Sequence, residues 1–172
     1  MTVRDTVQGT VQDQAIATTP DREIVIERSF DAPRDLVFDV WTDPKHVVHW
    51  WGPNGFTITI QEMNVTPGGV WRFVMHGPDG HDYPNHIEFI TVERPQRLVY
   101  RHTGRDDSEP VRFQATVTFT EERGRTKVTL RARFESNEAR DANIAKNHSL
   151  EGGKQHLGNL ATYLAKLQGE SR

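Results

Sequence analysis

Residues 111–134 read VRFQATVTFTEERGRTKVTLRARF, and this stretch decides the fold class. On both sides of the charged turn at Glu121–Arg125, apolar side chains alternate with polar ones. The residues in phase are Val111, Phe113, Ala115, Val117 and Phe119 before the turn, and Val128, Leu130, Ala132 and Phe134 after it. A period of two is typical of strands with one buried face, so the stretch predicts an antiparallel hairpin packed on a core.

Five more segments upstream of this hairpin favour strands. They are 22–30 (REIVIERSF), 56–60 (FTITI), 70–76 (VWRFVMH), 86–92 (HIEFITV) and 97–103 (RLVYRHT). Turns rich in glycine and proline at 66–69 and 77–80 separate three of them. Both parities of 86–92 carry apolar residues, so its inward face stays open. If even positions face inward, Glu88 is a buried carboxylate with a raised pKa and could act as an acid or base.

Helical spacing appears at two places in the chain. Apolar residues within 33–41 (PRDLVFDVW) recur at helical intervals, and Pro44 opens a second short helix in 43–51. After a short helical stretch at 137–145, one apolar stripe follows a long C-terminal helix through Leu150, Gly153, Leu157, Leu160, Ala161, Leu164 and Leu167. We therefore predict an α+β fold: a curved seven-stranded antiparallel sheet around the long C-terminal helix, with two short helices between the first two strands.

Length and composition limit the classes of function. We expect a flexible tail at 1–20, which is polar and aperiodic, and one domain at 21–169. With 21 basic and 24 acidic residues, the net charge of −3 gives no electrostatic footprint for nucleic acid. The absence of cysteine excludes disulfides, thiolate metal sites and a cysteine nucleophile. No window suggests a membrane span or a secretion signal, so we expect a cytoplasmic protein.

Three stretches carry a resemblance to a known family. They are 27–56 (ERSFDAPRDLVFDVWTDPKHVVHWWGPNGF), 65–80 (VTPGGVWRFVMHGPDG) and 92–104 (VERPQRLVYRHTG). Over about residues 22–168 the chain resembles bacterial single-domain members of the activator of heat-shock-90 ATPase homologue family. That family belongs to the START-like, or SRPBCC, superfamily with a birch-pollen-allergen-like fold. The resemblance implies the helix-grip fold, in which the sheet wraps round the long helix and a cavity lies between them. Carriers, cyclases and chaperone co-factors share this scaffold, so it leaves the function open.

One departure from similar sequences concerns the last helix. Where they usually place a glycine–tryptophan pair ahead of a pattern like KQHLGNL, this chain has Gly152-Gly153. The missing indole would either leave space in the cavity or be replaced by a neighbouring side chain. We predict a cavity near Gly153 that is larger than the family norm.

Trp50 and Trp51 adjoin the loop Gly52–Gly55. Neighbouring residues on a helix point about 100° apart, so both cannot face inward. We expect them to brace and rim the cavity entrance, one inside and one partly exposed; the alternative is that both are purely structural. His46 and His49 lack an evident third ligand, so we expect surface histidines, no metal site and no cofactor.

The predicted cavity lining combines inward strand residues, the last helix and the tryptophan corner. It comprises Trp50, Trp51, Trp71, Phe73, Met75, Tyr100, His102, Phe113, Val117, Leu130, Gly153, Leu157 and Leu160. Tyr100 and His102 share a face with Leu98 and are the polar groups best placed to orient a ligand. Hydrogen bonding to backbone or water would explain them equally well.

Three classes of function remain open. The first, which we favour, is binding of a small hydrophobic or amphipathic ligand by a carrier, sensor or sequestering protein. The second is stimulation of an ATPase through a protein surface; eukaryotic family members grip the chaperone with an extra N-terminal domain, so we do not expect a chaperone partner here. The third is a cavity enzyme of cyclase or hydrolase type, whose catalytic residues no linear motif identifies. A desolvated Glu or His beside a second polar group would favour catalysis. Homodimerisation through a sheet edge or the short helices also stays open.

Overall fold

The computed structural model describes residues 14–103 and 111–170. Its elements are β1 (Gln14–Thr19), β2 (Glu23–Phe30), α1 (Arg34–Thr42), α2 (Pro44–Val47), β3 (Thr57–Met63), β4 (Val70–His76), β5 (Asp82–Glu93), β6 (Arg97–His102), β7 (Phe113–Glu122), β8 (Arg125–Phe134), α3 (Asn137–Asn147) and α4 (Ser149–Glu170). The strands form one antiparallel sheet in the order β1-β2-β8-β7-β6-β5-β4-β3.

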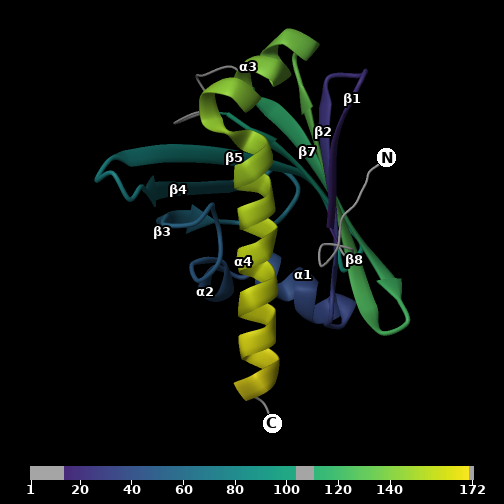
Figure 1. The fold of residues 1–172 in the computed structure, drawn as a ribbon. Helices are drawn as coiled ribbons and strands as arrows, with labels where there is room; N and C mark the ends of the chain where they lie inside the picture. Colours follow the sequence, from purple (N-terminus) through teal and green to yellow (C-terminus); the bar gives the residue numbers. More distant parts are fainter. Residues whose placement is uncertain (1–13, 104–110, 171–172) are drawn as a thin grey trace.

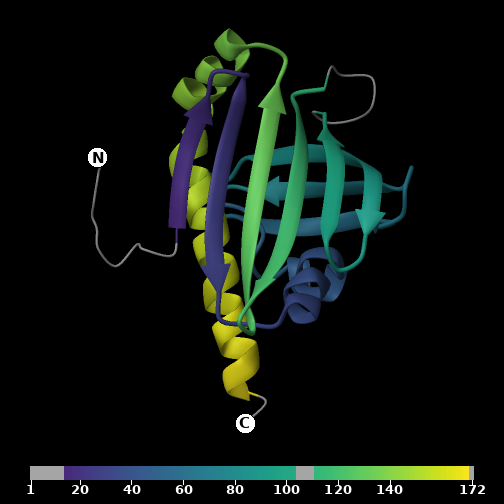
Figure 2. The same ribbon diagram turned by 90° about the vertical axis from the view of Figure 1, so that its right-hand side faces the viewer.

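The sheet curves around α4, as the helix-grip prediction requires. In Figure 1, β1 and β2 run roughly along α4 while β3, β4 and β5 lie across it. The rotated view in Figure 2 shows the same change of strand direction from one end of the sheet to the other. Leu157, Leu160 and Leu164 of α4 are buried against the concave face. No helix in the described ranges combines the length and hydropathy that a bilayer crossing requires.

Within the described residues the sheet has eight strands, so the prediction of seven was wrong. The additional strand, β1, lies within residues 1–20, which the sequence predicted to be a tail. It pairs antiparallel with β2, from Gln14 opposite Arg28 to Thr19 opposite Glu23. Its ladder needs little apolar burial because β1 is an edge strand, and only Ile16 of β1 packs against the core. The strand was not predicted because its sequence is polar and has no period of two. With β1 included, both short helices follow the second strand rather than the first. Residues 1–13 of that tail lie outside the described residues.

The two short helices form where the sequence predicted them. Val37 and Val40 of α1 are fully buried, and the ring of Trp41 meets the Phe119 ring of β7 edge to face at 5.7 Å. The Asp43 carboxylate accepts the Lys45 N–H at 3.0 Å and caps α2. These contacts fix the helical corner on the sheet.

The structure decides the face of β5 that the sequence left open. Ile87 and Phe89 are buried, so odd positions face the core. Glu88 points to the other side of the sheet, where its carboxylate lies 3.4 Å from the Arg101 guanidinium. Glu88 is therefore half-exposed and has no role as a buried acid.

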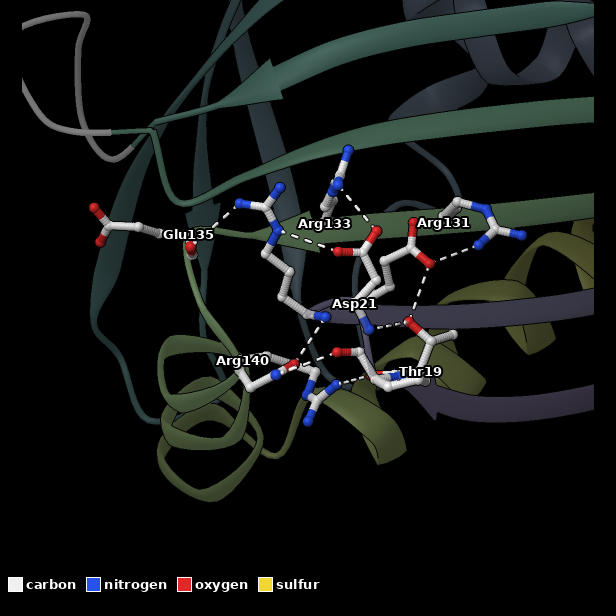
Figure 3. A network of polar contacts seen from close by, with 10 residues as sticks. Thr19, Asp21, Arg131, Arg133, Glu135 and Arg140 are labelled. Carbon is white, nitrogen blue, oxygen red and sulfur yellow. Dashed lines mark hydrogen bonds and ion pairs between the residues drawn. The ribbon is translucent and has the colours of Figure 1, made fainter.

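A polar network attaches α3 to the turn between β1 and β2. The Arg140 guanidinium donates a hydrogen bond to the Thr19 carbonyl (Figure 3). The Asn137 side chain accepts from the Arg22 N–H at 2.8 Å and donates to the Pro20 carbonyl at 3.2 Å. These hydrogen bonds join residues 19–22 to α3, which is more than 100 positions later in the sequence, and so fix α3 at the top of the sheet in Figure 1.

Two ion pairs extend the same network onto β8. Arg133 lies 2.9 Å from the Asp21 carboxylate, and Arg131 lies 2.6 Å from that of Glu23. Glu23 also accepts from the Thr19 hydroxyl at 3.1 Å. Figure 3 shows Arg131 and Arg133 of β8 and Arg140 of α3 around Thr19 and Asp21. These ion pairs join β8 to the same β1–β2 turn that Asn137 and Arg140 of α3 contact.

Candidate ligand-binding pocket

An inner pocket of about 240 Å³ lies between the sheet and the first turns of α4. Its apolar wall comes mainly from β2, β7 and β8, with Ile24, Ile26, Phe113, Leu130, Ala132 and Phe134. Its other sides are formed by Trp51, Gly52, Pro53, Met75, Gly152 and Gly153. Five polar residues also line it: Tyr100, His102, Asn143, Ser149 and His156. The pocket is thus a mostly apolar space with a few polar groups.

Tyr100 and His102 are successive inward-facing residues of β6. Burial raises the pKa of Tyr100, so its hydroxyl stays neutral. Burial, and secondarily the nearby Arg112 charge, lowers the pKa of His102 to about 4. The His102 ring stacks on Phe113 with centroids 5.0 Å apart, and its buried Nδ1 has no hydrogen-bond partner in the described part of the chain. At pH 7 both residues are uncharged hydrogen-bonding groups.

His156 joins the pocket to the tryptophan corner. Its Nδ1 accepts the Gly52 N–H at 2.9 Å, so the neutral ring carries its proton on Nε2. Burial lowers the pKa of His156 to about 3. The ring lies edge to face against Trp51 at 4.4 Å and against Trp41 at 6.0 Å. An uncharged imidazole is therefore packed among indoles at the base of the loop.

Two further side chains of α4 hold the same loop. The Asn159 amide donates to the Gly52 carbonyl at 2.9 Å, and the Gln155 carbonyl oxygen accepts the Asn54 N–H at 3.0 Å. Gly52 has a φ of +100°, which favours glycine over other residues. The loop that borders the pocket is thus fixed to α4 by three residues at helical spacing.

Trp50 and Trp51 have different environments. Trp50 lies in the core, where its Nε1 donates to the Val40 carbonyl at 2.9 Å. Trp51 is partly buried, lines the inner pocket and contacts the Trp71 ring edge to face at 4.7 Å. Trp50 thus braces the corner from inside while Trp51 forms part of the pocket wall.

The structure divides the residues predicted to line a cavity into two groups. Those on the inner pocket are Trp51, Met75, Tyr100, His102, Phe113, Leu130 and Gly153. Those buried in the core away from it are Trp50, Trp71, Phe73, Val117, Leu157 and Leu160. Alternation identifies the inward face of a strand, but it does not say where along that strand tight packing gives way to open space. The polar lining residues His156, Asn143 and Ser149 were not predicted. For His156 the one sequence signal is its helical spacing with Gln155 and Asn159, which also contact the loop after Trp51.

Gly153 allows α4 to approach β2 closely. A Cβ at this position would overlap the Ile26 side chain. Ile26 therefore occupies space beside the glycine, and the inner pocket continues next to it. The missing indole was expected either to leave open space or to be replaced by a neighbouring side chain. At Gly153 itself, the Ile26 side chain fills the space.

His46 and His49 both contact Tyr163 of α4. The His46 Nδ1 and the Tyr163 hydroxyl form a hydrogen bond of 2.7 Å. The His49 ring stacks on Tyr163 with centroids 5.5 Å apart. Within residues 14–103 and 111–170, no group of three or more His, Asp or Glu side chains is arranged to hold a metal ion.

The curved sheet, the enclosed long helix and the pocket between them define a helix-grip domain of the START-like class. The family model for Activator of Hsp90 ATPase homolog 1-like protein matches residues 31–165, and the chain belongs to this family. A search of curated proteins gives no significant match.

Solved structures from several bacteria have the same fold. A protein from Arthrobacter aurescens is 26% identical with a TM-score of 0.80, and the match covers 88% of this chain and 91% of that one. Protein Ms6760 from Mycobacterium smegmatis is 24% identical with a TM-score of 0.78, covering 87% and 95%. Protein NE0264 from Nitrosomonas europaea is 21% identical with a TM-score of 0.77, covering 88% and 99%. The likeness to the last two concerns the fold alone.

Proposed function

We propose that the protein binds a small hydrophobic or amphipathic molecule in the inner pocket, as a carrier, sensor or sequestering protein. The observation that carries this proposal is the pair Tyr100 and His102, two neutral polar groups within an apolar lining. Ligand sites combine apolar walls with a few polar groups that orient the ligand. The buried Nδ1 of His102, which lacks a protein partner among the described residues, is available to a ligand hydroxyl or carbonyl.

A cavity enzyme is the second candidate, because a desolvated histidine lies near a tyrosine in the same pocket. The pKa of His102, lowered to about 4, argues against this role at neutral pH. A general base works best when its pKa is near the working pH, and His102 is a much weaker base than an ordinary histidine. Tyr100, with its raised pKa, is likewise held in its neutral form. Both residues are suited to hydrogen bonding a ligand rather than to removing its proton.

A protein-binding surface has less support. The large hydrophobic residues most exposed in the described part are Val48, Tyr83 and Val111, which come from three separate segments. An exposed apolar patch is the usual mark of a partner site. Ligand binding is therefore the function that we favour.

Native mass spectrometry of the purified full chain, followed by extraction and identification of any bound molecule, tests the proposal. We expect a co-purifying hydrophobic molecule, or uptake of a fluorescent fatty acid or steroid. Ala132→Leu places extra atoms in the inner pocket and should reduce uptake, whereas Ala165→Leu, on the exposed side of α4, should not. A clean apo mass together with no uptake of either probe would overturn the proposal. Turnover of the extracted molecule that is lost in His102→Asn would favour the enzyme instead.

A further inference from the structure

The inner pocket lies beside a second hollow. An outer groove of about 680 Å³ shares Pro53, Met75 and Gly152 with the inner pocket, so the two spaces meet at these three residues, and we call this boundary the neck. Ligand pockets usually measure roughly 300–1,000 Å³, and the inner pocket alone is smaller than this. We therefore expect a ligand of ordinary size that fills the inner pocket to extend past the neck into the outer groove.

The outer groove carries two cationic side chains from different elements. Arg112 directly precedes β7, and its N–H donates to the His102 carbonyl at 2.8 Å, which places it next to the inner pocket. Lys146 lies in the last turn of α3. Both residues are exposed, and neither forms an ion pair within the described ranges. The groove thus presents two positive charges that other described residues do not neutralise.

The groove also contains two acidic side chains, Asp82 and Glu151, and neither forms an ion pair with Arg112 or Lys146 in the described residues. Asp82 is already engaged by the His76 ring, whose Nδ1 lies 2.8 Å from its carboxylate. Glu151 lies in the first turn of α4, where the helix dipole stabilises an acidic side chain. His148 and Tyr83 also border the groove. The charge at the groove is therefore mixed, and its unengaged cations lie on β7 and α3.

We propose that the ligand is an amphiphile with a carboxylate head, held at Arg112 and Lys146, and an apolar body that reaches through the neck into the inner pocket. This inference rests on the proposed function and specifies its ligand class. A guanidinium binds a carboxylate through two parallel hydrogen bonds, and a lysine adds a second charge. The reverse orientation is unfavourable because the inner pocket offers only neutral partners, and an uncompensated buried charge is costly.

The test compares octanoate with 1-octanol, which share a chain length and differ in head-group charge. Binding to the full chain is measured by calorimetry at pH 7 and low salt, with the intrinsic tryptophan fluorescence, to which Trp51 in the pocket wall contributes, as a second readout of pocket occupancy. We expect octanoate to bind about tenfold more tightly than octanol, and Arg112→Gln or Lys146→Gln each to weaken octanoate about fivefold. Octanol binding should stay unchanged in both variants. Lys45→Gln, which removes an exposed charge outside both pockets, is the matched control.

The outcomes separate this inference from the proposed function. Equal affinity for the two molecules, with no effect of either substitution, overturns the carboxylate head while leaving ligand binding intact. Failure of octanoate, octanol and the fluorescent probes to bind overturns both. A loss of octanoate affinity in Lys45→Gln as large as that in Arg112→Gln would show a general charge effect and also contradict the inference.

Discussion

The Nδ1 of His156 accepts a hydrogen bond from the Gly52 N–H across 104 residues of sequence. This contact joins α4 to the loop that follows the tryptophan pair. It also sets the protonation state of the ring, because an imidazole nitrogen that accepts from an N–H carries no proton itself. The wall of the inner pocket therefore depends on one neutral histidine.

Replacing this acceptor should destabilise the domain. In His156→Phe the ring volume is largely kept, but the Gly52 N–H loses its partner, which should lower the free energy of unfolding by about 1–3 kcal/mol. Urea unfolding measures the change, and His49→Phe, at an exposed position, is the control. A cost below about 0.5 kcal/mol would mean that the hydrogen bond contributes little.

Stability should fall on mild acidification. The pKa values of His102 and His156 are lowered by burial to about 4 and about 3, from an ordinary value of 6.5. Below pH 6.5 these two histidines become protonated in the unfolded chain but stay neutral in the folded chain. The free energy of unfolding therefore decreases as the pH falls toward the folded pKa values. Each histidine should contribute a loss of roughly 1–2 kcal/mol between pH 6.5 and 5.

Unfolding curves at several pH values, for wild type and His156→Phe, check this dependence. The variant should show a shallower slope between pH 6.5 and 5, because one of the two titrating groups has been removed. The pKa of Asp79, lowered to about 2, acts only below about pH 4 and does not affect this window. Parallel slopes in the two proteins would refute the role assigned to His156.

Gly153 should not tolerate a side chain while Ile26 remains. Gly153→Ala introduces a Cβ that overlaps the Ile26 Cδ1, and we expect a cost of about 1–2 kcal/mol from overpacking. Ile26→Val removes that carbon. Adding Gly153→Ala to an Ile26→Val background should therefore cost much less unfolding free energy than adding it to the wild type.

Gly158→Ala is the matched control for this prediction. Its Cβ would lie 3.8 Å from the Arg28 guanidinium, an ordinary contact, and alanine favours the helix by up to about 1 kcal/mol. Thermal unfolding of the four variants separates the steric effect from helix propensity. Equal effects of alanine at both positions would argue against the Ile26 contact.

The network that holds α3 should depend on Arg140, which with Glu23 is one of its two buried members. Arg140 is 8% exposed and donates to the Thr19 carbonyl, so Arg140→Met should cost about 2–3 kcal/mol. Arg133→Met removes an exposed ion pair with Asp21 and should cost no more than about 1 kcal/mol. Hydrogen exchange of the α3 amides, measured with urea unfolding, should show faster exchange in Arg140→Met only. Similar exchange in both variants would mean that the network acts as a whole.

Local patterns allowed much of the architecture to be predicted. The alternation in 111–134 predicted β7 and β8 with their inward faces, because a strand turns successive side chains to opposite sides. Asp43 and Pro44 predicted the start of α2, since the cap and the fixed φ of proline act within one turn. Two features lack such a local pattern. The strand β1 was not predicted, and the inward face of β5 was left open.

The sequence by itself determined the fold class of this protein, the long apolar stripe of α4 and the two candidate polar groups, Tyr100 and His102. Only the tertiary structure decided that Trp51 lines the pocket while Trp50 and Trp71 lie in the core, and that His156 closes onto Gly52. The physical reason is that periodicity is a property of one segment, set by its backbone geometry. A pocket is the space left after distant segments have packed, and no single segment encodes it.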